Sequence, residues 1–451
     1  MSRKLFGTDG IRGVAGEPPL DFRTAYALGV ALGDWARTAK QHSSESPVVV
    51  IGMDTRESGP GLAAQVAGGL KRSGVKAHFA GVITTPGVAY LARDGDYVAG
   101  VMISASHNPY LDNGIKVIDH GGYKLADSIE EHLEQRMFEW LDSREEPVAE
   151  PVRADPALDH LYGDFLASSV SAPLPFRLVI DCANGSATAV APQLFRRLGA
   201  KVHAIANEPN GRNINLDCGS LHLDLLREHV VRHGAEAGVA FDGDADRALF
   251  VASDGRIIDG DAVLFLAGVA LKKSGRLKGD MVVATVMSNL GLEKALEAYG
   301  IRLIRTPVGD KYVLEEMLRR EAVLGGEQSG HVIFSEYATT GDGILTALRV
   351  LEILRDSGKT ISELTAEIKT FPQKLVNIRV KQKRPLSELA QVQQEIHAAE
   401  GEFAERGRVV VRFSGTEPLA RVMIEADSEQ QVEKWTTRIA DAIRQELGAI
   451  E

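Results

Sequence analysis

Short apolar runs alternate with longer amphipathic stretches along the chain, and the same order recurs three times. In each copy an apolar run of strand length leads through a polar turn into a stretch with helical periodicity, and a glycine then precedes a second apolar run. Two strands joined by a helix form a βαβ unit, which requires a parallel or mixed sheet. The copies comprise residues 48–52, 61–72 and 75–79; 178–180, a helix ending near 198, and 200–204; and 281–285, 292–299 and 301–304.

The last part of the chain has a different pattern, with two helices set among three strands rather than a further βαβ copy. This order is typical of a small α+β domain. Its predicted strands are 375–380, 409–413 and 421–425, and its predicted helices are 386–399 and a last one with Val432, Trp435, Ile439 and Ile443 on one face.

Polar segments mark the boundaries between these units. Residues 142–151 are rich in charge and proline and suit a linker, while Ser-Asp-Gly at 253–255 and Thr-Phe-Pro at 370–372 interrupt the pattern later. We therefore predict an α/β protein with three tandem related α/β domains that have mixed sheets, followed by a smaller C-terminal α+β domain. The predicted domains are 1–150, 151–254, 255–370 and 371–451.

Charge and cysteine content narrow the classes of function. The 451 residues carry a formal net charge of -11, which argues against nucleic acid or an anionic membrane as the main partner, because both require a broad basic surface. Only Cys182 and Cys218 are present, without metal-binding spacing, as expected in a reducing cytoplasm. Neither a signal peptide nor an apolar run of membrane-spanning length is apparent.

A hydroxyl and an imidazole follow one predicted strand. The apolar run 98–103 reads as a buried strand, and Asn-Pro at 108–109 forces a turn directly after it. The polar segment between them emerges at the strand end, where open α/β sheets bind ligands. Ser104, with His107 close by, is thus the candidate centre of the chemistry. The alternative is that Ser104 and Ser106 only satisfy amides of the turn.

Three carboxylates follow another apolar strand, 238–241. Asp242, Asp244 and Asp246 alternate with small residues, so the loop can curl until the oxygens converge. They would then repel one another unless a cation lay among them, and oxygen ligands favour a hard ion such as Mg²⁺. A calcium-binding EF-hand is excluded because Ser253 stands where the bidentate Glu is needed. A solvated acidic turn is the alternative.

A glycine flanked by hydroxyls and guanidinium groups predicts a phosphate-binding loop near the C-terminus. Arg412 ends an apolar strand, Ser414, Gly415 and Thr416 follow it, and Arg421 lies shortly beyond. Backbone amides, two hydroxyls and two cations can bind one phosphate. The alternative is a hairpin turn with an unrelated arginine.

Polar residues also separate the apolar segments 322–324 and 332–334. Glu327 and Ser329 stand at alternate positions and can bind neighbouring hydroxyls of a sugar, whereas His331 is either a site residue or a structural turn residue.

Two further segments read as structural from their pattern alone. The glycine-rich segment 7–13 is expected to form a tight turn. Asn-Gly at 113–114 is expected to form a hairpin turn into a strand, in which Lys116 lies on the face opposite Ile115 and Val117 and is solvated.

Together these segments resemble the α-D-phosphohexomutase superfamily, and the match runs from Gly7 to Arg421. The four diagnostic loops are all present, one in each predicted domain. The resemblance implies three similar α/β domains and a fourth α+β domain around a central cleft. Within the superfamily, segments 4–13, 103–109 and 208–215 are similar to the bacterial branch that acts on glucosamine phosphates.

The resemblance also implies a role for each loop. Ser104 would carry a phosphoryl group as phosphoserine, and Asp242, Asp244 and Asp246 would hold the Mg²⁺ that contacts it. Proton transfer would fall to Lys116, His107 and His331, in that order, with Arg12 among the catalytic residues; Arg247, Glu327 and Ser329 would bind the sugar, and Arg412, Ser414, Gly415, Thr416 and Arg421 the phosphate.

The implied reaction is an isomerisation of a small-molecule sugar phosphate. Glucosamine 6-phosphate would become glucosamine 1-phosphate through a 1,6-bisphosphate, supplying UDP-N-acetylglucosamine for the cell wall. Glucosamine 1,6-bisphosphate or glucose 1,6-bisphosphate would act as activator, and a homodimer is one assembly to be considered. Alternatives are a phosphomannomutase or phosphoglucomutase, a catalytically silent sugar-phosphate-binding regulator, and a metal-dependent phosphatase.

Overall fold

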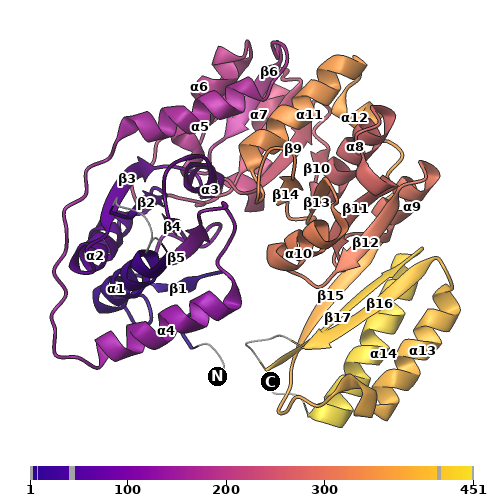
Figure 1. The fold of residues 1–451 in the computed structure, drawn as a ribbon. Coiled ribbons are helices and arrows are strands. Elements are labelled where there is room, and N and C mark those ends of the chain that lie inside the picture. Colours follow the sequence, from indigo (N-terminus) through magenta and orange to yellow (C-terminus); the bar gives the residue numbers. More distant parts are fainter. Residues whose placement is uncertain (1–3, 8, 40–45, 414–417, 449–451) are drawn as a thin grey trace.

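The computed structural model describes residues 4–7, 9–39, 46–413 and 418–448, and it contains four successive sheets (Figure 1). The first three sheets mix parallel and antiparallel strands and are covered by helices, whereas the last is small and antiparallel. The predicted class, three related α/β domains and a smaller α+β domain, is confirmed. No helix of the described ranges is long and apolar enough to cross a bilayer.

The first sheet has the order β1-β5-β4-β2-β3. Strands β4, β2 and β3 are parallel to one another, β5 is antiparallel to β4, and β1 pairs antiparallel with β5 at the edge. Its strands are β1 (Ile11–Val14), β2 (Val48–Met53), β3 (Lys76–Val82), β4 (Ala99–Ile103) and β5 (Asp112–Asp119), and its helices are α1 (Phe22–Ala39), α2 (Gly59–Arg72), α3 (Thr85–Asp94) and α4 (Asp127–Leu141).

The second sheet repeats this plan with the order β10-β9-β8-β6-β7. Strand β10 pairs with β9, so this sheet continues past the boundary that we placed after residue 254. Its strands are β6 (Arg177–Asp181), β7 (Lys201–Ile205), β8 (Ala237–Phe241), β9 (Ala248–Ala252) and β10 (Ile257–Ile258), and its helices are α5 (Pro156–Ser168), α6 (Ala187–Arg197), η1 (Gly219–Leu221) and α7 (Asp224–His233).

The third sheet has four strands in the order β12-β11-β13-β14. The first three are parallel and β14 is antiparallel. Its strands are β11 (Met281–Thr285), β12 (Arg302–Thr306), β13 (Leu324–Gly326) and β14 (Val332–Phe334), and its helices are α8 (Gly260–Lys273), η2 (Lys278–Asp280), α9 (Leu290–Ala298), α10 (Asp310–Arg320), α11 (Gly343–Ser357) and α12 (Ile361–Leu364).

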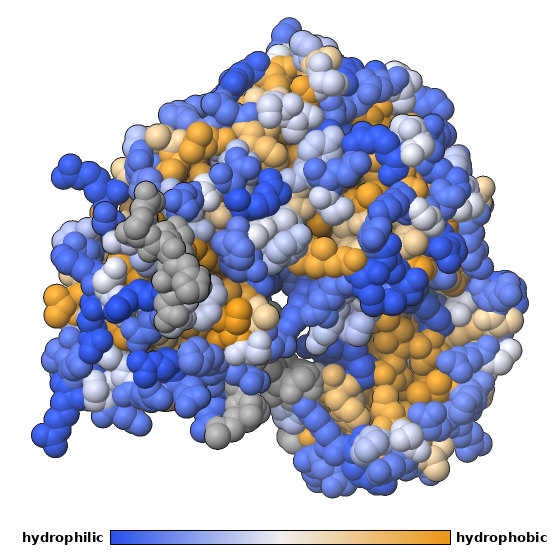
Figure 2. Space-filling model, in the orientation of Figure 1, coloured by the Kyte–Doolittle hydropathy of each residue, from blue (hydrophilic) through white to orange (hydrophobic). Residues whose placement is uncertain are grey.

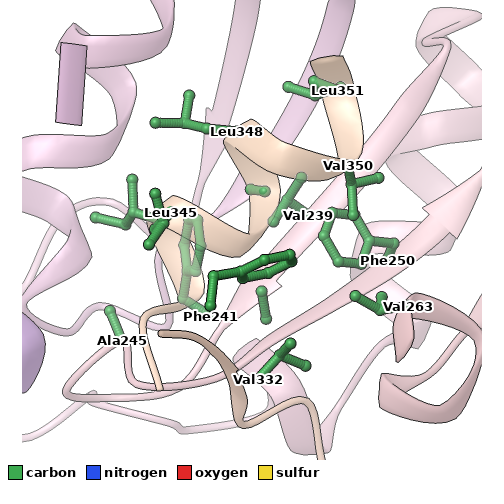
Figure 3. Packing of buried hydrophobic residues seen from close by; sticks show 14 of the residues in the cluster. Val239, Phe241, Ala245, Phe250, Val263, Val332, Leu345, Leu348, Val350 and Leu351 are labelled. Carbon is green, nitrogen blue, oxygen red and sulfur yellow. The ribbon is translucent and has the colours of Figure 1, made fainter. Parts of the chain in front are cut away.

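The second and third domains share a hydrophobic core (Figure 3). Phe241 and Phe250 of the second sheet pack in one cluster with Val332 of β14 and Leu348 of α11. Ala245, in the loop after β8, belongs to the same cluster and is fully buried. Close packing of this kind resists deformation, so the loop that carries the three aspartates is held in a fixed position.

The C-terminal domain is an antiparallel sheet, β15-β17-β16, with two helices packed against it. The apolar face predicted for the last helix is confirmed, because Val432, Trp435, Ile439 and Ile443 are buried there. Its elements are β15 (Gln373–Arg379), η3 (Leu386–Glu388), α13 (Ala390–Phe403), β16 (Gly407–Phe413), β17 (Leu419–Ala426) and α14 (Glu429–Leu447). Figure 2 shows the surface hollowed between this domain and the first one.

The hairpin turn that we predicted at 113–114 is wrong. Asn113 and Gly114 lie inside β5, where they pair with Gly13 and Arg12 of β1. The Asn-Gly signal is outweighed because β1, a strand far away in sequence, supplies ladder partners that a local reading cannot include.

Candidate active site

Three buried carboxylates form the centre of the site. Asp242 and Asp244 are fully buried and Asp246 nearly so, and their ligand oxygens lie within 4.8 Å of one another. Ala245 adopts a φ of 55°, which turns the loop and lets the oxygens converge. The solvated acidic turn considered above is therefore wrong.

The electrostatics of this cluster call for a cation. Burial, followed by the charges of Asp246 and Asp244, raises the pKa of Asp242 well above its usual range. Burial acts in the same direction on the pKa of Asp246, but His331 and Lys116 outweigh it and lower that pKa. One oxygen each of Asp244 and Asp246 is buried without a hydrogen-bond partner. These residues fit a hard divalent ion such as Mg²⁺.

Ser106 contacts the carboxylates. Its Oγ donates a hydrogen bond to Asp242 Oδ2 at 2.6 Å and lies 3.3 Å from His107 Nδ1. The residue is buried in the left-handed region, with a φ of 54°. Non-glycine residues held there are uncommon and often functional. The loop after β4 thus presents the second serine of the motif to the aspartates.

Ser104 lies in a different environment. Its Oγ donates to Asp54 Oδ2 at 2.6 Å and accepts a hydrogen bond from the backbone N–H of Ser106 at 2.9 Å. In the contacts of the described residues, Ser104 therefore stabilises the turn, as in the alternative reading above. The expectation that Ser104 contacts the metal-binding carboxylates is corrected: the serines two positions apart face different partners, and only the tertiary structure shows which one meets Asp242.

Asp54 and Arg56, which the sequence analysis missed, support the serine loop through hydrogen bonds and an ion pair. The Arg56 guanidinium is buried, forms an ion pair with Asp54 at 3.0 Å, and donates to the carbonyl oxygens of Ser106, Asn108 and Pro109 at 2.9–3.0 Å. Both residues follow β2, which is parallel to and paired with β4. The sequence could have indicated both residues, because they follow a predicted strand and adjacent parallel strands bring their C-terminal ends together.

Lys116 is buried rather than solvated. Its Nζ lies 2.9 Å from Asp244 Oδ2 and 3.2 Å from Asp9 Oδ2. Burial alone would lower the pKa of Lys116, but Asp244 and Asp9 raise it, so the ammonium stays charged. The face opposite Ile115 was correctly assigned, yet that face meets the second domain instead of water.

The glycine-rich N-terminal segment is both a turn and part of the site. Gly7 N donates to Gly10 O at 2.9 Å, as a turn requires, and β1 begins directly afterwards. Asp9 forms ion pairs with Arg12, Lys116 and Lys124, and these cations lower its pKa well below the usual range although burial opposes them. Asp9 was not among the predicted residues.

The third domain contributes the loop between β13 and β14. His331 is buried; its Nε2 accepts from Gly341 N at 3.1 Å, and its Nδ1 lies 3.5 Å from Asp246 Oδ2. Glu327 Oε1 accepts a hydrogen bond from Gly309 N at 3.1 Å. The Oγ of Ser329 is buried without a hydrogen-bond partner, and so is the Nε of Arg247. Such unpaired polar atoms are what a polar ligand would satisfy.

His107 and Arg247 share the neighbourhood of the carboxylates. Burial, then the charges of Arg247 and Arg12, lowers the pKa of His107 to about 4, so its imidazole is neutral at pH 7. Asp246 and Asp242 raise the pKa of Arg247 although burial opposes them. A neutral imidazole and a guanidinium thus flank the site.

The C-terminal loop is described only in part, because Ser414, Gly415 and Thr416 lie outside the described residues. Arg412 and Arg421 stand directly opposite each other in the β16–β17 ladder. Burial and then the charge of Arg421 lower the pKa of Arg412. Like charges placed opposite each other are unfavourable, and an anion bound between them would relieve the repulsion.

Comparison with known families agrees with this division of the chain. Residues 3–144, 158–255 and 259–371 match the alpha/beta/alpha domains I, II and III of phosphoglucomutase/phosphomannomutase, and residues 375–442 match the C-terminal domain. The chain belongs to the phosphoglucomutase/phosphomannomutase family. The superfamily resemblance noted from the motifs is thereby confirmed.

Relatives within the family cover the whole chain. A phosphoglucosamine mutase of Solibacter usitatus is 57% identical over 449 residues, which span 99% of this chain and 100% of the relative. The crystal structure of a family protein from Burkholderia thailandensis is 26% identical, with a TM-score of 0.79, over 99% of this chain and 98% of that one.

A more distant solved structure has bound ligands. It is an Aspergillus fumigatus N-acetylphosphoglucosamine mutase in complex with GlcNAc-6P and magnesium, 19% identical with a TM-score of 0.61, over 98% of this chain and 96% of that one. At this identity the likeness concerns the fold. That complex contains magnesium, and in this chain Asp242, Asp244 and Asp246 form a buried group that could hold a metal ion.

Proposed function

We propose that this chain interconverts glucosamine 6-phosphate and glucosamine 1-phosphate. The full-length bacterial relative at 57% identity is a phosphoglucosamine mutase, and a second, from Koribacter versatilis, is 50% identical. The product would supply UDP-N-acetylglucosamine synthesis, as the sequence resemblance implied. The buried free thiols Cys182 and Cys218 fit a reducing cytoplasm.

The phosphoryl carrier in this proposal is Ser106, in place of Ser104. The observation that carries it is the 2.6 Å hydrogen bond from Ser106 Oγ to Asp242, within the carboxylate cluster. A phosphoryl group on Ser106 Oγ would lie beside the proposed metal site, where a cation can neutralise its charge. A phosphoryl group on Ser104 would face the buried Asp54 carboxylate, which would repel it.

Asp242, Asp244 and Asp246 would hold Mg²⁺, which when bound neutralises charge on the transferring phosphoryl oxygens. Lys116 adds a fixed ammonium, held by Asp244 and Asp9. Catalysis of phosphoryl transfer depends mainly on positioning and on such charges. Ser106 and Lys116 of the first domain already contact Asp242 and Asp244 of the second, so these charged groups need little rearrangement before transfer.

Each transfer moves one phosphoryl group between Ser106 Oγ and a sugar hydroxyl. The Oγ–P bond breaks while a bond forms between phosphorus and O1 of the 6-phosphate, and the O1 proton passes to a base. The 1,6-bisphosphate then reorients; its O6–P bond breaks as phosphorus bonds to Ser106 Oγ, and O6 takes the proton back from the base. Of the candidates Lys116, His107 and His331, the imidazole of His107 lies 3.3 Å from Ser106 Oγ.

The remaining loops would bind the parts of the sugar phosphate that do not react. Glu327 and Ser329 offer acceptors and a hydroxyl to the sugar. The Nε of Arg247 and the Oγ of Ser329 are buried without a hydrogen-bond partner, which supports this role. The C-terminal loop, with Arg412 and Arg421, would hold the phosphate that is not transferred. A sugar 1,6-bisphosphate would serve as activator by restoring the phosphoserine.

The experiment is to map the phosphoryl group. Intact-mass measurement and peptide mapping of purified protein should place it on Ser106, and Ser106→Ala should lose both label and mutase activity. Ser104→Ala is the matched control, because it removes a hydroxyl two residues away and should keep the label. A label on Ser104, or an active Ser106→Ala variant, would overturn the assignment.

The substrate is tested separately. Turnover per Michaelis constant should be higher for glucosamine phosphates than for glucose or mannose phosphates, with no inorganic phosphate released. Equal efficiency with glucose phosphate would move the chain to a phosphoglucomutase activity, and stoichiometric phosphate release would indicate a phosphatase.

A further inference from the structure

Three histidines come together in the second domain, away from the carboxylate cluster. His203 lies on the edge strand β7, and His229 and His233 lie on α7. One ring nitrogen of each lies within 4.8 Å of those of the other two. Within the described part of the chain, the hydrogen bond and the ring contacts of the three histidines join them to one another and not to the carboxylate site.

The arrangement follows from the fold. His229 and His233 are four residues apart, so they share one face of α7. Residues Leu226 and Val230 of the same helix pack on the sheet, which sets α7 beside the strand that carries His203. Paired histidines at this helical spacing are a common way to bind a metal ion, and the neighbouring strand supplies the third imidazole.

The distances suit one ion. His203 Nε2 and His229 Nδ1 are 3.1 Å apart, and the centroids of the His203 and His233 rings are 4.1 Å apart. A tetrahedral ion with Zn–N bonds of about 2.0–2.1 Å requires nitrogen atoms roughly 3.4 Å apart. The three rings lie within 18–32° of parallel, so the side chains would rotate on binding until their nitrogen lone pairs converge on the ion, with water at the fourth position.

The electrostatics favour a particular class of cation. The three residues offer only imidazole nitrogens, which bind metal ions as neutral ligands. The cluster ends α7, where the helix dipole stabilises positive charge. Arg177, Arg196 and Lys201 line the adjoining surface pocket and would repel a hard ion held only by charge. Neutral imidazoles instead select Zn²⁺, Ni²⁺ or Cu²⁺ over Mg²⁺.

We propose that His203, His229 and His233 form a second metal site, which binds a late first-row divalent cation such as Zn²⁺ and ties β7 to the C-terminal turn of α7. It is independent of the proposed mutase function. A bound ion would cross-link an edge strand to the helix that covers it, so the second domain would be stabilised by the ion.

The test is Zn²⁺ binding by the full chain in excess Mg²⁺, so that the aspartates are already occupied. Calorimetry should give one Zn²⁺ per chain, and removing any one of the three imidazoles should weaken it by at least about tenfold. His233→Ala is the most informative variant because the side chain is exposed and the fold tolerates its loss. His222→Ala, exposed in the same domain, is the matched control and should bind as the parent does.

Two further measurements complete the test. X-ray absorption of the zinc complex should show three imidazole nitrogens, and mutase activity with Mg²⁺ should be unchanged in His233→Ala. Equal Zn²⁺ binding by the parent and by a variant that lacks all three histidines, or a zinc shell of carboxylate oxygens, would overturn the proposal.

Discussion

Replacing Arg56 tests whether its buried ion pair supports the serine loop, which an exposed ion pair would not do. The residue is 1% exposed, pairs with the fully buried Asp54, and donates to three carbonyl oxygens of the loop that carries Ser106. Arg56→Met keeps much of the volume but leaves a buried carboxylate without its cation. Removing one partner of a buried ion pair costs about 3–5 kcal/mol.

Asp54 would respond by binding a proton. Burial already raises its pKa, and Arg56 is the first group that opposes this rise. In Arg56→Met the carboxyl should therefore be neutral at higher pH than in the parent. Arg56→Lys should recover part of the loss, because an ammonium restores the charge but cannot reach three carbonyls with the geometry of a guanidinium.

The assay is urea unfolding together with steady-state mutase kinetics. Arg72→Met is the matched control, since Arg72 lies in the same domain and pairs with Glu145 at 2.7 Å, but in an exposed bridge. Exposed bridges contribute about 0–1 kcal/mol. Displacement of the Ser106 loop should also lower kcat on the order of a hundredfold. If Arg56→Met loses no more stability than Arg72→Met, the buried pair does not support the loop as described.

Three further results are expected. Asp244→Asn should abolish turnover and the stabilisation by Mg²⁺, which reaches about 2.7 kcal/mol at a hundredfold excess over Kd; activity that survives chelation would contradict the metal assignment. Arg412→Ala should raise KM about 30-fold in both directions, the equivalent of about 2 kcal/mol, whereas an effect in one direction only would contradict a shared phosphate site. Burial raises the pKa of Asp181 to about 6, so the protonated carboxyl stabilises the fold fully below about pH 4, and this stabilisation is lost as the pH rises through about 6. Asp181→Asn should remove this pH dependence, which amounts to up to about 3 kcal/mol of the free energy of unfolding. An unchanged pH dependence would refute the raised pKa.

The sequence by itself determined the elements and their class. Each predicted strand and helix of the three βαβ copies has a counterpart, for example β2 at 48–53 and α2 at 59–72. Apolar periodicity is a local property, and it decides which segments must be buried. The aspartate loop could also be predicted from a local pattern, because alternating carboxylates directly after a buried strand have few explanations other than a bound cation.

Tertiary contacts decided which of these side chains act together. Ser104 and Ser106 are equivalent in a turn read from sequence, yet only Ser106 meets Asp242, from a domain more than a hundred residues away. Lys116 is a solvated lysine by its local pattern, and a buried one because the second domain covers its face with Asp244. Burial, pairing and pKa depend on neighbours brought by other domains, and no local pattern contains them.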